Sequence, residues 1–224
     1  MKKISFLFFV TILISSCTPS YYPSTLNIGL LKNPGDFKAR GTVDKASVNF
    51  QGIACIRENI IIGASVNVFK LRETTKGSFG NSGGTFNSKG TQFEVSGGYF
   101  KPFGRKGIFE ILAIGGVADI ESNDIFGKMY KVGLQPTLGV TSKNLESSFS
   151  LRIVNVSVEE SAILDPYETV TSSLFVEPAV TFSLGFERLK ISYQLGFSFG
   201  SNEAAFENKE FLNTIGLQYN FQSR

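Results

Sequence analysis

The sequence predicts an all-β fold, an up-and-down antiparallel transmembrane β-barrel of about ten strands. Three observations lead to this prediction. Apolar and polar residues alternate over much of the chain, and this period of two is the side-chain repeat of a β-strand. The polar faces carry mostly small or amide side chains, whereas the exterior of a soluble protein should be rich in charge. The links between the alternating runs are short and long in turn, as in barrels with short turns at one end and longer loops at the other.

Ten runs fit the strand pattern. They lie near residues 36–44, 47–56, 60–70, 91–100, 108–120, 129–141, 147–156, 173–186, 189–200 and 210–221. The run 189–200 alternates most cleanly, whereas the pattern blurs in 108–120 because almost every position there is apolar. An even number of strands places both ends of the barrel domain, residues 36–221, on the periplasmic side.

The connections support the same topology. Short links are expected near residues 57–59, 101–106, 142–144 and 187–188, and longer polar links near 71–90, 121–128, 157–171 and 201–209. Only the link near Lys45 is short where a long one is expected. Short periplasmic turns and long external loops alternate in this way in outer-membrane barrels.

Alternation alone does not decide which face points outward. A lipocalin-like soluble barrel would place Phe and Leu inside and charged side chains outside. A Lys or Arg exposed to lipid at mid-depth costs ~2–4 kcal/mol, whereas charges that face inward can pair. We therefore predict a network in the lumen formed by Glu94, Lys131, Arg152 and Glu177, and the alternative is that these charges are solvated near the rims.

The N-terminus has the layout of a secretory signal peptide, with Lys2 and Lys3 before an almost wholly apolar run from Ile4 to Ile14. The ending Ile14-Ser15-Ser16-Cys17 resembles the lipobox of bacterial lipoproteins. The resemblance implies a lipoprotein signal peptide over residues 1–16, and cleavage before Cys17 with acylation of Cys17, for example by palmitate. An ordinary signal peptide followed by a chance cysteine is the alternative.

Residues 17–35 are expected to form a tether, because the stretch holds three prolines together with Ser and Gly. No acidic residue lies between Thr18 and Thr25. Acidic residues often follow the cysteine in surface lipoproteins of the Bacteroidota, so their absence favours an anchor on the periplasmic side of the membrane.

The last run, residues 210–221, ends in two aromatic residues on its apolar face. Within it, the pattern Thr214-x-Gly216-x-x-Tyr219-x-Phe221 resembles the C-terminal β-signal of bacterial outer-membrane barrels. The resemblance implies that the outer-membrane assembly machinery reads this strand, and that the strand closes the barrel against the first one. Residues 222–224 follow the final aromatic, where many such proteins end.

Composition excludes several classes of function. Removing residues 1–16 takes away two lysines and no acids, so the formal charge falls from +3 to +1 and no nucleic-acid partner is implied. The sequence contains no His, which is the commonest general base and metal ligand and a residue on which outer-membrane proteases and lipid A-modifying barrels rely. We therefore expect no enzyme, no cofactor and no metal site.

The oxygen-bearing cluster of Asp119, Glu121, Asn123 and Asp124 lacks a calcium-loop signature, and we interpret it as a polar loop.

The whole pattern resembles small outer-membrane β-barrel proteins of the Bacteroidota, a family that implies no single activity. A ten-stranded barrel is close to the size at which side chains fill the lumen, so a general diffusion pore is disfavoured. We expect a barrel in the cell outer membrane that acts as a scaffold or binds an unidentified extracellular ligand through its loops. Apolar residues are expected in these loops at Phe79, Phe86, Ile125, Phe126, Ile163, Leu164, Tyr167 and Phe206. The alternative is a lipid-anchored periplasmic lipocalin-like barrel that binds an apolar ligand.

Overall fold

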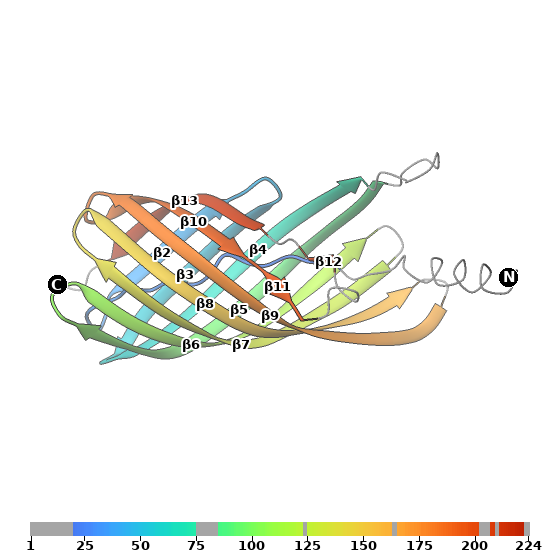
Figure 1. The fold of residues 1–224 in the computed structure, drawn as a ribbon, viewed down its shortest axis with the longest axis horizontal. Coiled ribbons are helices and arrows are strands. Elements are labelled where there is room, and N and C mark those ends of the chain that lie inside the picture. The colour runs from blue at the N-terminus through green and yellow to red at the C-terminus, as the bar shows by residue number, and fades with distance from the viewer. Residues whose placement is uncertain are drawn as a thin grey trace, which may run out of the picture.

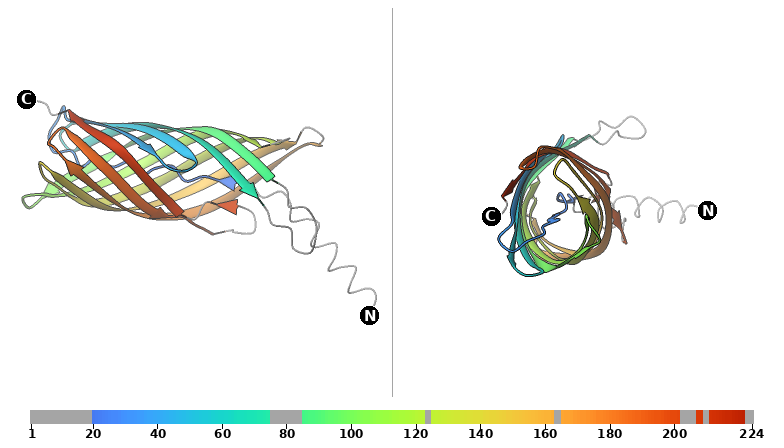
Figure 2. Two further views of the ribbon diagram at one scale, coloured as in Figure 1. Left: turned by 90° about the horizontal axis from the view of Figure 1, so that it is seen from above. Right: turned by 90° about the vertical axis from the view of Figure 1, so that its left-hand side faces the viewer.

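The computed structural model describes residues 20–74, 85–122, 125–162, 165–201, 207–208 and 211–221. In these ranges a single antiparallel sheet closes into a barrel of ten long strands (Figures 1 and 2). They are β2 (Phe37–Val43), β3 (Ser47–Arg57), β4 (Ile60–Thr74), β5 (Thr85–Phe103), β6 (Gly107–Ser122), β7 (Ile125–Thr141), β8 (Leu145–Ala162), β9 (Asp165–Gly185), β10 (Leu189–Phe197) and β13 (Phe211–Phe221). Three two-residue strands complete the set: β1 (Ser20–Tyr21), β11 (Phe199–Gly200) and β12 (Glu207–Asn208). Within these ranges, no helix has the length and apolar character needed to cross a membrane.

The barrel closes between its first and last long strands. β13 pairs with β10 on one side and with β2 on the other, and the register with β2 runs from Ile215 opposite Val43 to Phe221 opposite Phe37. The barrel domain therefore begins and ends at the same rim, which also carries the short turns β3–β4, β5–β6, β7–β8 and β9–β10. We call this rim the turn end and the opposite rim the loop end.

The predicted fold class is confirmed, and each predicted run coincides with a strand. The largest differences lie at the loop end, where residues expected in loops continue as paired strands. β4 and β5 pair as far as Thr74 opposite Thr85, and β8 and β9 as far as Ala162 opposite Asp165. Hydrophobic alternation marks only the part of a strand that meets lipid, whereas backbone pairing needs no apolar side chain. The loop residues Phe86, Ile125, Phe126 and Tyr167 thus belong to strands, while Phe79, Ile163, Leu164 and Phe206 lie outside the described residues.

The apolar faces of the strands point outward. Phe197 and Leu217 are 49% and 60% exposed, whereas Gln194 and Gln218 on the opposite face are 2% and 0% exposed. A soluble ligand-binding barrel has the reverse arrangement, so the lipocalin-like alternative does not fit this chain. An apolar exterior around a polar interior is the arrangement of a β-barrel in a lipid bilayer, which supports location in the outer membrane.

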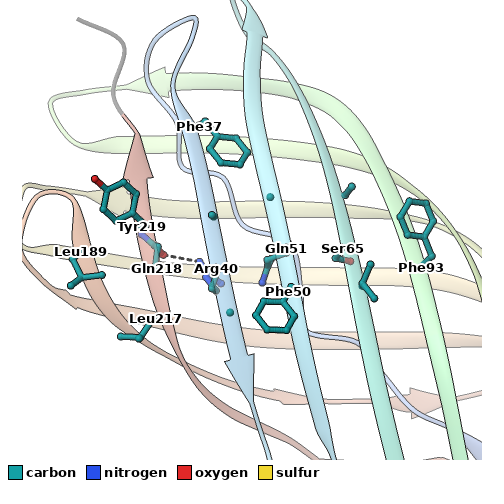
Figure 3. A pocket seen from close by; sticks show the side chains of 15 residues that line it. Phe37, Arg40, Phe50, Gln51, Ser65, Phe93, Leu189, Leu217, Gln218 and Tyr219 are labelled. Carbon is teal, nitrogen blue, oxygen red and sulfur yellow. Dashed lines mark hydrogen bonds between the residues drawn. The ribbon is translucent and has the colours of Figure 1, made fainter.

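The outer surface is hollowed beside the closing seam. A groove of about 490 Å³ lies over β2, β3 and β4, with small residues such as Gly41 and Gly52 on its floor. Figure 3 shows the rings of Phe37, Phe50 and Phe93 around it. An added Cβ at Gly41 would meet the Phe50 ring at 3.2 Å, and one at Gly52 would meet the Phe37 ring at 3.2 Å, so these two glycines let both rings lie close to the sheet.

Candidate functional site: the filled lumen

The N-terminal stretch occupies the inside of the barrel. Every residue from Tyr21 to Leu31 is buried, and Figure 2 shows this stretch within the ring of strands when the barrel is viewed along its length. We call residues 21–31 the lumen segment. Sequence composition indicated a tether over residues 17–35, and the structure instead places most of that stretch in the barrel. About eight strands give an interior just filled by side chains, and the wider ten-stranded barrel accommodates one extended chain.

The lumen segment enters at the loop end. The Tyr22 hydroxyl hydrogen-bonds Asp44, the residue that follows β2 at that rim, and the Tyr22 ring stacks on Phe69 with centroids 5.2 Å apart. The Tyr21 hydroxyl donates to Glu177 at 2.9 Å, and the Tyr21 ring lies 4.3 Å from that of Phe175. These contacts fix the first two residues of the segment against different strands of the wall.

The lumen segment leaves at the turn end. Glu110, near the start of β6, accepts hydrogen bonds from the backbone N–H groups of Gly29 and Leu30. Lys38, near the start of β2, donates to the carbonyl of Gly29. The segment therefore crosses the barrel before the chain turns back through residues 32–36 and enters β2.

A cluster of charges lies in the middle of the lumen. The Nη1 atom of Arg152 lies 3.7 Å from Oε2 of Glu94 and 3.6 Å from Oε2 of Glu177. Lys131 forms an ion pair with Glu94. All four side chains are buried, so the structure brings together the four residues that the sequence predicted as a network and places none of them at a solvated rim. Buried charges normally require pairing and hydrogen bonds of this kind.

The lumen segment completes this cluster, which sequence reasoning missed. The Ser24 hydroxyl donates to Glu94 at 2.7 Å and accepts from Lys131 at 3.0 Å and from Arg152 at 2.8 Å. Gln135 on β7 accepts from Nε and Nη2 of Arg152 at 3.2 and 3.1 Å, and its amide donates to the carbonyl of Asn27. The network thus ties the wall of the barrel to the chain inside it.

A second charge cluster lies near the turn end and was not predicted. Glu146 is paired with Lys38 at 2.9 Å and with Lys190 at 2.8 Å, and it accepts from the amide of Gln218 at 2.8 Å. The Gln218 carbonyl in turn accepts from Arg40 at 3.0 Å (Figure 3). Glu110 lies next to this cluster, because Gly29 donates to Glu110 through its N–H group and accepts from Lys38 through its carbonyl oxygen.

Apolar layers pack both ends of the lumen segment. At the turn end, Leu30 belongs to a buried cluster with further members Ile28, Leu31, Ile53, Cys55, Ile61, Phe100, Ile108, Leu112 and Ile114. At the loop end, Tyr21 belongs to a second cluster with Ala118, Met129, Val154, Val156, Val158 and Phe175. Strand β6 contributes inward apolar residues to both clusters, which explains why its sequence shows no alternation.

One wall of the lumen is lined by buried amide side chains that lack hydrogen-bond partners among the described residues. The amides of Asn49, Asn67 and Gln92 are neighbours across β3, β4 and β5 and are almost completely buried. Their side-chain nitrogen and oxygen atoms have no hydrogen-bond partner among the described residues. Buried amides normally bond to protein or to water, so this strip is suited to binding water inside the lumen.

The remaining predicted site residues lie elsewhere. In β13, Thr214 faces the lumen, while Tyr219 and Phe221 are exposed on the outer face near the turn end. Gly216 approaches the backbone of Gly41 so closely that a Cβ would collide with it. Recognition of this strand by the assembly machinery remains a prediction. Cys17 lies outside the described residues and its acylation likewise remains a prediction.

The structure contains no candidate metal centre in the part of the chain that it describes, where no three His, Cys, Asp or Glu side chains gather suitably. Asp119 and Glu121 lie near the loop end of β6, and Asn123 and Asp124 lie outside the described residues. The arrangement inside the barrel is suited to holding a chain in place.

No protein-family model matches the chain, and no curated protein is similar to it at a significant level. Solved structures to which it is similar include a KdgM porin in complex with disordered oligogalacturonate (14% identity, TM-score 0.35, 84% of this chain and 99% of that chain covered). The translocator domain of autotransporter NalP from Neisseria meningitidis is 10% identical, with a TM-score of 0.43 and coverage of 83% and 86%. The β domain of the Bordetella autotransporter Brka is 8% identical, with a TM-score of 0.42 and coverage of 84% and 99%. Similarities at this level carry no information about what this chain binds or does.

Proposed function

We propose that this protein is an outer-membrane β-barrel whose own N-terminal segment closes its lumen to solutes, and that it serves the cell envelope as a scaffold or through binding by its loop end. The observation that carries the proposal is the complete burial of residues 21–31 inside the barrel. The apolar exterior supports insertion in the membrane, since Phe197, Leu217 and their outward neighbours would otherwise face water.

A permanently filled lumen is favoured by the bonds that the segment would lose on leaving. Withdrawal would remove Ser24 from Glu94, Lys131 and Arg152, and would separate the Gly29 and Leu30 amides from Glu110. Water would replace these partners in an open lumen, so each lost hydrogen bond counts at its net value, which is about 1.5–3 kcal/mol when one group is charged. The apolar clusters at both ends add to this cost, so spontaneous opening to an open pore is strongly disfavoured.

The loop end is the part of the molecule best placed to meet a partner. A transmembrane strand needs about 9–11 residues, whereas β5, β8 and β9 have 19, 18 and 21 residues. At the turn end these strands are joined by short turns, so their surplus length projects from the loop end, as Figure 1 shows for β4, β5, β8 and β9. Such extensions provide a surface outside the bilayer, which supports a binding role.

A non-enzymatic role is part of the proposal. The sequence contains no His, and the buried carboxylates of Glu94, Glu177 and Glu146 are each engaged by cations. Paired carboxylates that catalyse hydrolysis need room for a substrate between them, and here the lumen segment fills that space.

Ion conductance in planar lipid bilayers tests the closed lumen. The wild-type barrel should show no steady open-pore conductance, whereas a variant with residues 21–31 replaced by Gly and Ser repeats of equal length should show frequent openings. Unboiled samples of both proteins should migrate faster than boiled ones in gels, which verifies that the barrels are folded. A stable open-pore conductance of the folded wild-type protein would overturn the proposal.

The binding role is tested with a barrel shortened at the loop end. Removing equal numbers of residues from β8 and β9 next to Ala162 and Asp165 should preserve folding, because the pairing of these strands in the membrane is unchanged. In a deletion strain challenged with detergent, we expect the wild-type gene to restore growth. The gene for the shortened barrel should fail to restore it. Full restoration by the shortened barrel would contradict a role for these extensions.

A further inference from the structure

We infer that the mature N-terminus leaves the barrel at the loop end, so that an acyl chain on Cys17 enters the outer leaflet and the anchor lies at the cell surface. This inference rests on the lumen segment staying in the barrel, as in the proposed function, and adds the side of the membrane on which the anchor lies. It reverses the expectation of an inner-leaflet anchor.

The inference rests on the direction in which the lumen segment runs, from the loop end to the turn end. Ser20 and Tyr21 pair in parallel with Glu207 and Asn208, which belong to the long connection between β11 and β13 at the loop end. Tyr22 contacts Asp44, in the β2–β3 link at the same rim. The other end of the segment, at Gly29 and Leu30, lies against Glu110 near the turn end.

The chain between Cys17 and Ser20 is too short to reach the leaflet at the turn end. The ten steps from Tyr21 to Leu31 span up to ~35 Å when extended, which is enough to cross an apolar band ~25 Å tall. Only three residue steps separate Cys17 from Ser20, and these reach at most ~11 Å. An anchor at Cys17 therefore cannot return to the leaflet at the turn end.

The orientation of the barrel determines on which side of the membrane the N-terminus lies. Outer-membrane barrels place their short turns in the periplasm and their longer connections outside. The turns at residues 58–59 and 104–106 are short, whereas the strands at the other rim extend well beyond the length that crosses a bilayer. The loop end is therefore the external end, and the chain before Ser20 starts from there.

The two tyrosines at the loop end hold this threading in place. Tyr21 and Tyr22 are both fully buried, and they contact different walls of the barrel through Glu177 and Asp44. Sliding of the segment toward the periplasm would break the contacts of Tyr21 with Glu177 and of Tyr22 with Asp44. The anchor and the lumen segment together form one continuous connection from the outer leaflet to the turn end.

An epitope tag inserted between Thr18 and Pro19 of the full chain tests the inference in cells that make the protein. Antibody should bind this tag in intact cells. The matched control carries the same tag after Gly104 in the β5–β6 turn, and it should bind antibody only after the outer membrane is permeabilised. Faster migration of unboiled samples identifies the tagged proteins that have folded, and only these are compared.

The inference would be overturned if antibody bound the N-terminal tag only after permeabilisation while the control behaved as expected. In that case, a bilayer recording without open-pore conductance would leave the proposed function intact. An open-pore conductance of the wild-type barrel would overturn the proposed function itself. The mass of the N-terminal peptide should include acyl chains in the wild type, and the Cys17→Ser variant should lack them. An unmodified Cys17 in the wild type would overturn the anchoring part.

Discussion

The hydroxyl of Ser24 donates a 2.7 Å hydrogen bond to the carboxylate of Glu94 in the centre of the barrel. The same oxygen accepts from Lys131 and Arg152, so its one donor and both of its acceptor positions are used. A single small side chain of the lumen segment thus bridges one anion and two cations of the wall. Its contribution to holding the segment should be large for its size.

Replacing Ser24 with Ala should lower the stability of the folded barrel. The change leaves three buried charged groups with one hydrogen bond fewer each, and we expect a loss of about 1–3 kcal/mol. Urea unfolding of the barrel in phospholipid vesicles measures the shift in midpoint. Ser148→Ala is the matched control, because Ser148 is also buried in the lumen and its hydroxyl has no partner among the described residues. Equal midpoints for the two variants would contradict the bridging role.

The Glu94–Lys131 pair should show strong coupling in a double-mutant cycle. Glu94→Gln leaves Lys131 buried next to Arg152, and Lys131→Met leaves Glu94 with one cation fewer, so each single change should cost about 3–5 kcal/mol. The double variant should cost clearly less than the sum, because neither side chain then carries an unpaired charge. Unfolding free energies of the four proteins in the same vesicles provide the measurement. Simple additivity would show that the two residues do not act as a pair.

The sequence was sufficient to predict the barrel because the prediction follows from the cost of exposing the wrong group to lipid. Alternation in runs such as 189–200 identifies two faces, and the scarcity of charge on the polar face decides which one points inward. Glu94, Lys131, Arg152 and Glu177 were candidates for the lumen for the same reason, because each interrupts an otherwise uncharged face, but the sequence alone left open whether they pair there or are solvated near the rims.

The lumen segment could not be predicted from its own residues, because prolines and small polar residues also describe a tether. Its signal lay in β6, where Ile108, Leu112 and Ile114 face inward although the lumen was expected to be polar. Apolar residues on both faces of a membrane strand indicate that something apolar fills the barrel. Glu146 was missed for a different reason, because it lies at the edge of the link predicted near residues 142–144 and was not assigned to a strand.

Neutralising Glu146 should destabilise the turn end of the barrel. Glu146→Gln leaves Lys38 and Lys190 buried without their shared carboxylate, and we expect a loss of about 3–5 kcal/mol. Glu121→Gln is the matched control, because Glu121 forms a 3.0 Å ion pair with Lys89 that is exposed to solvent and is worth at most ~1 kcal/mol. The urea midpoints of both variants in vesicles provide the comparison. A similar small shift for both would show that the buried cluster is not important for stability.

Replacing Gly216 with Ala should impair closure of the barrel. A Cβ at this position would collide with the carbonyl oxygen of Gly41 and lie 2.6 Å from Cγ2 of Thr42, both on β2, so the seam between β13 and β2 would have to open locally. We expect a smaller folded fraction and slower folding, measured by the difference in gel migration between unboiled and boiled samples during folding into vesicles. Gly115→Ala is the matched control, since a Cβ there meets no atom within 4 Å. If both variants folded at the wild-type rate, close approach at Gly216 would not limit closure, and its place in the C-terminal pattern would need another explanation, such as recognition during assembly.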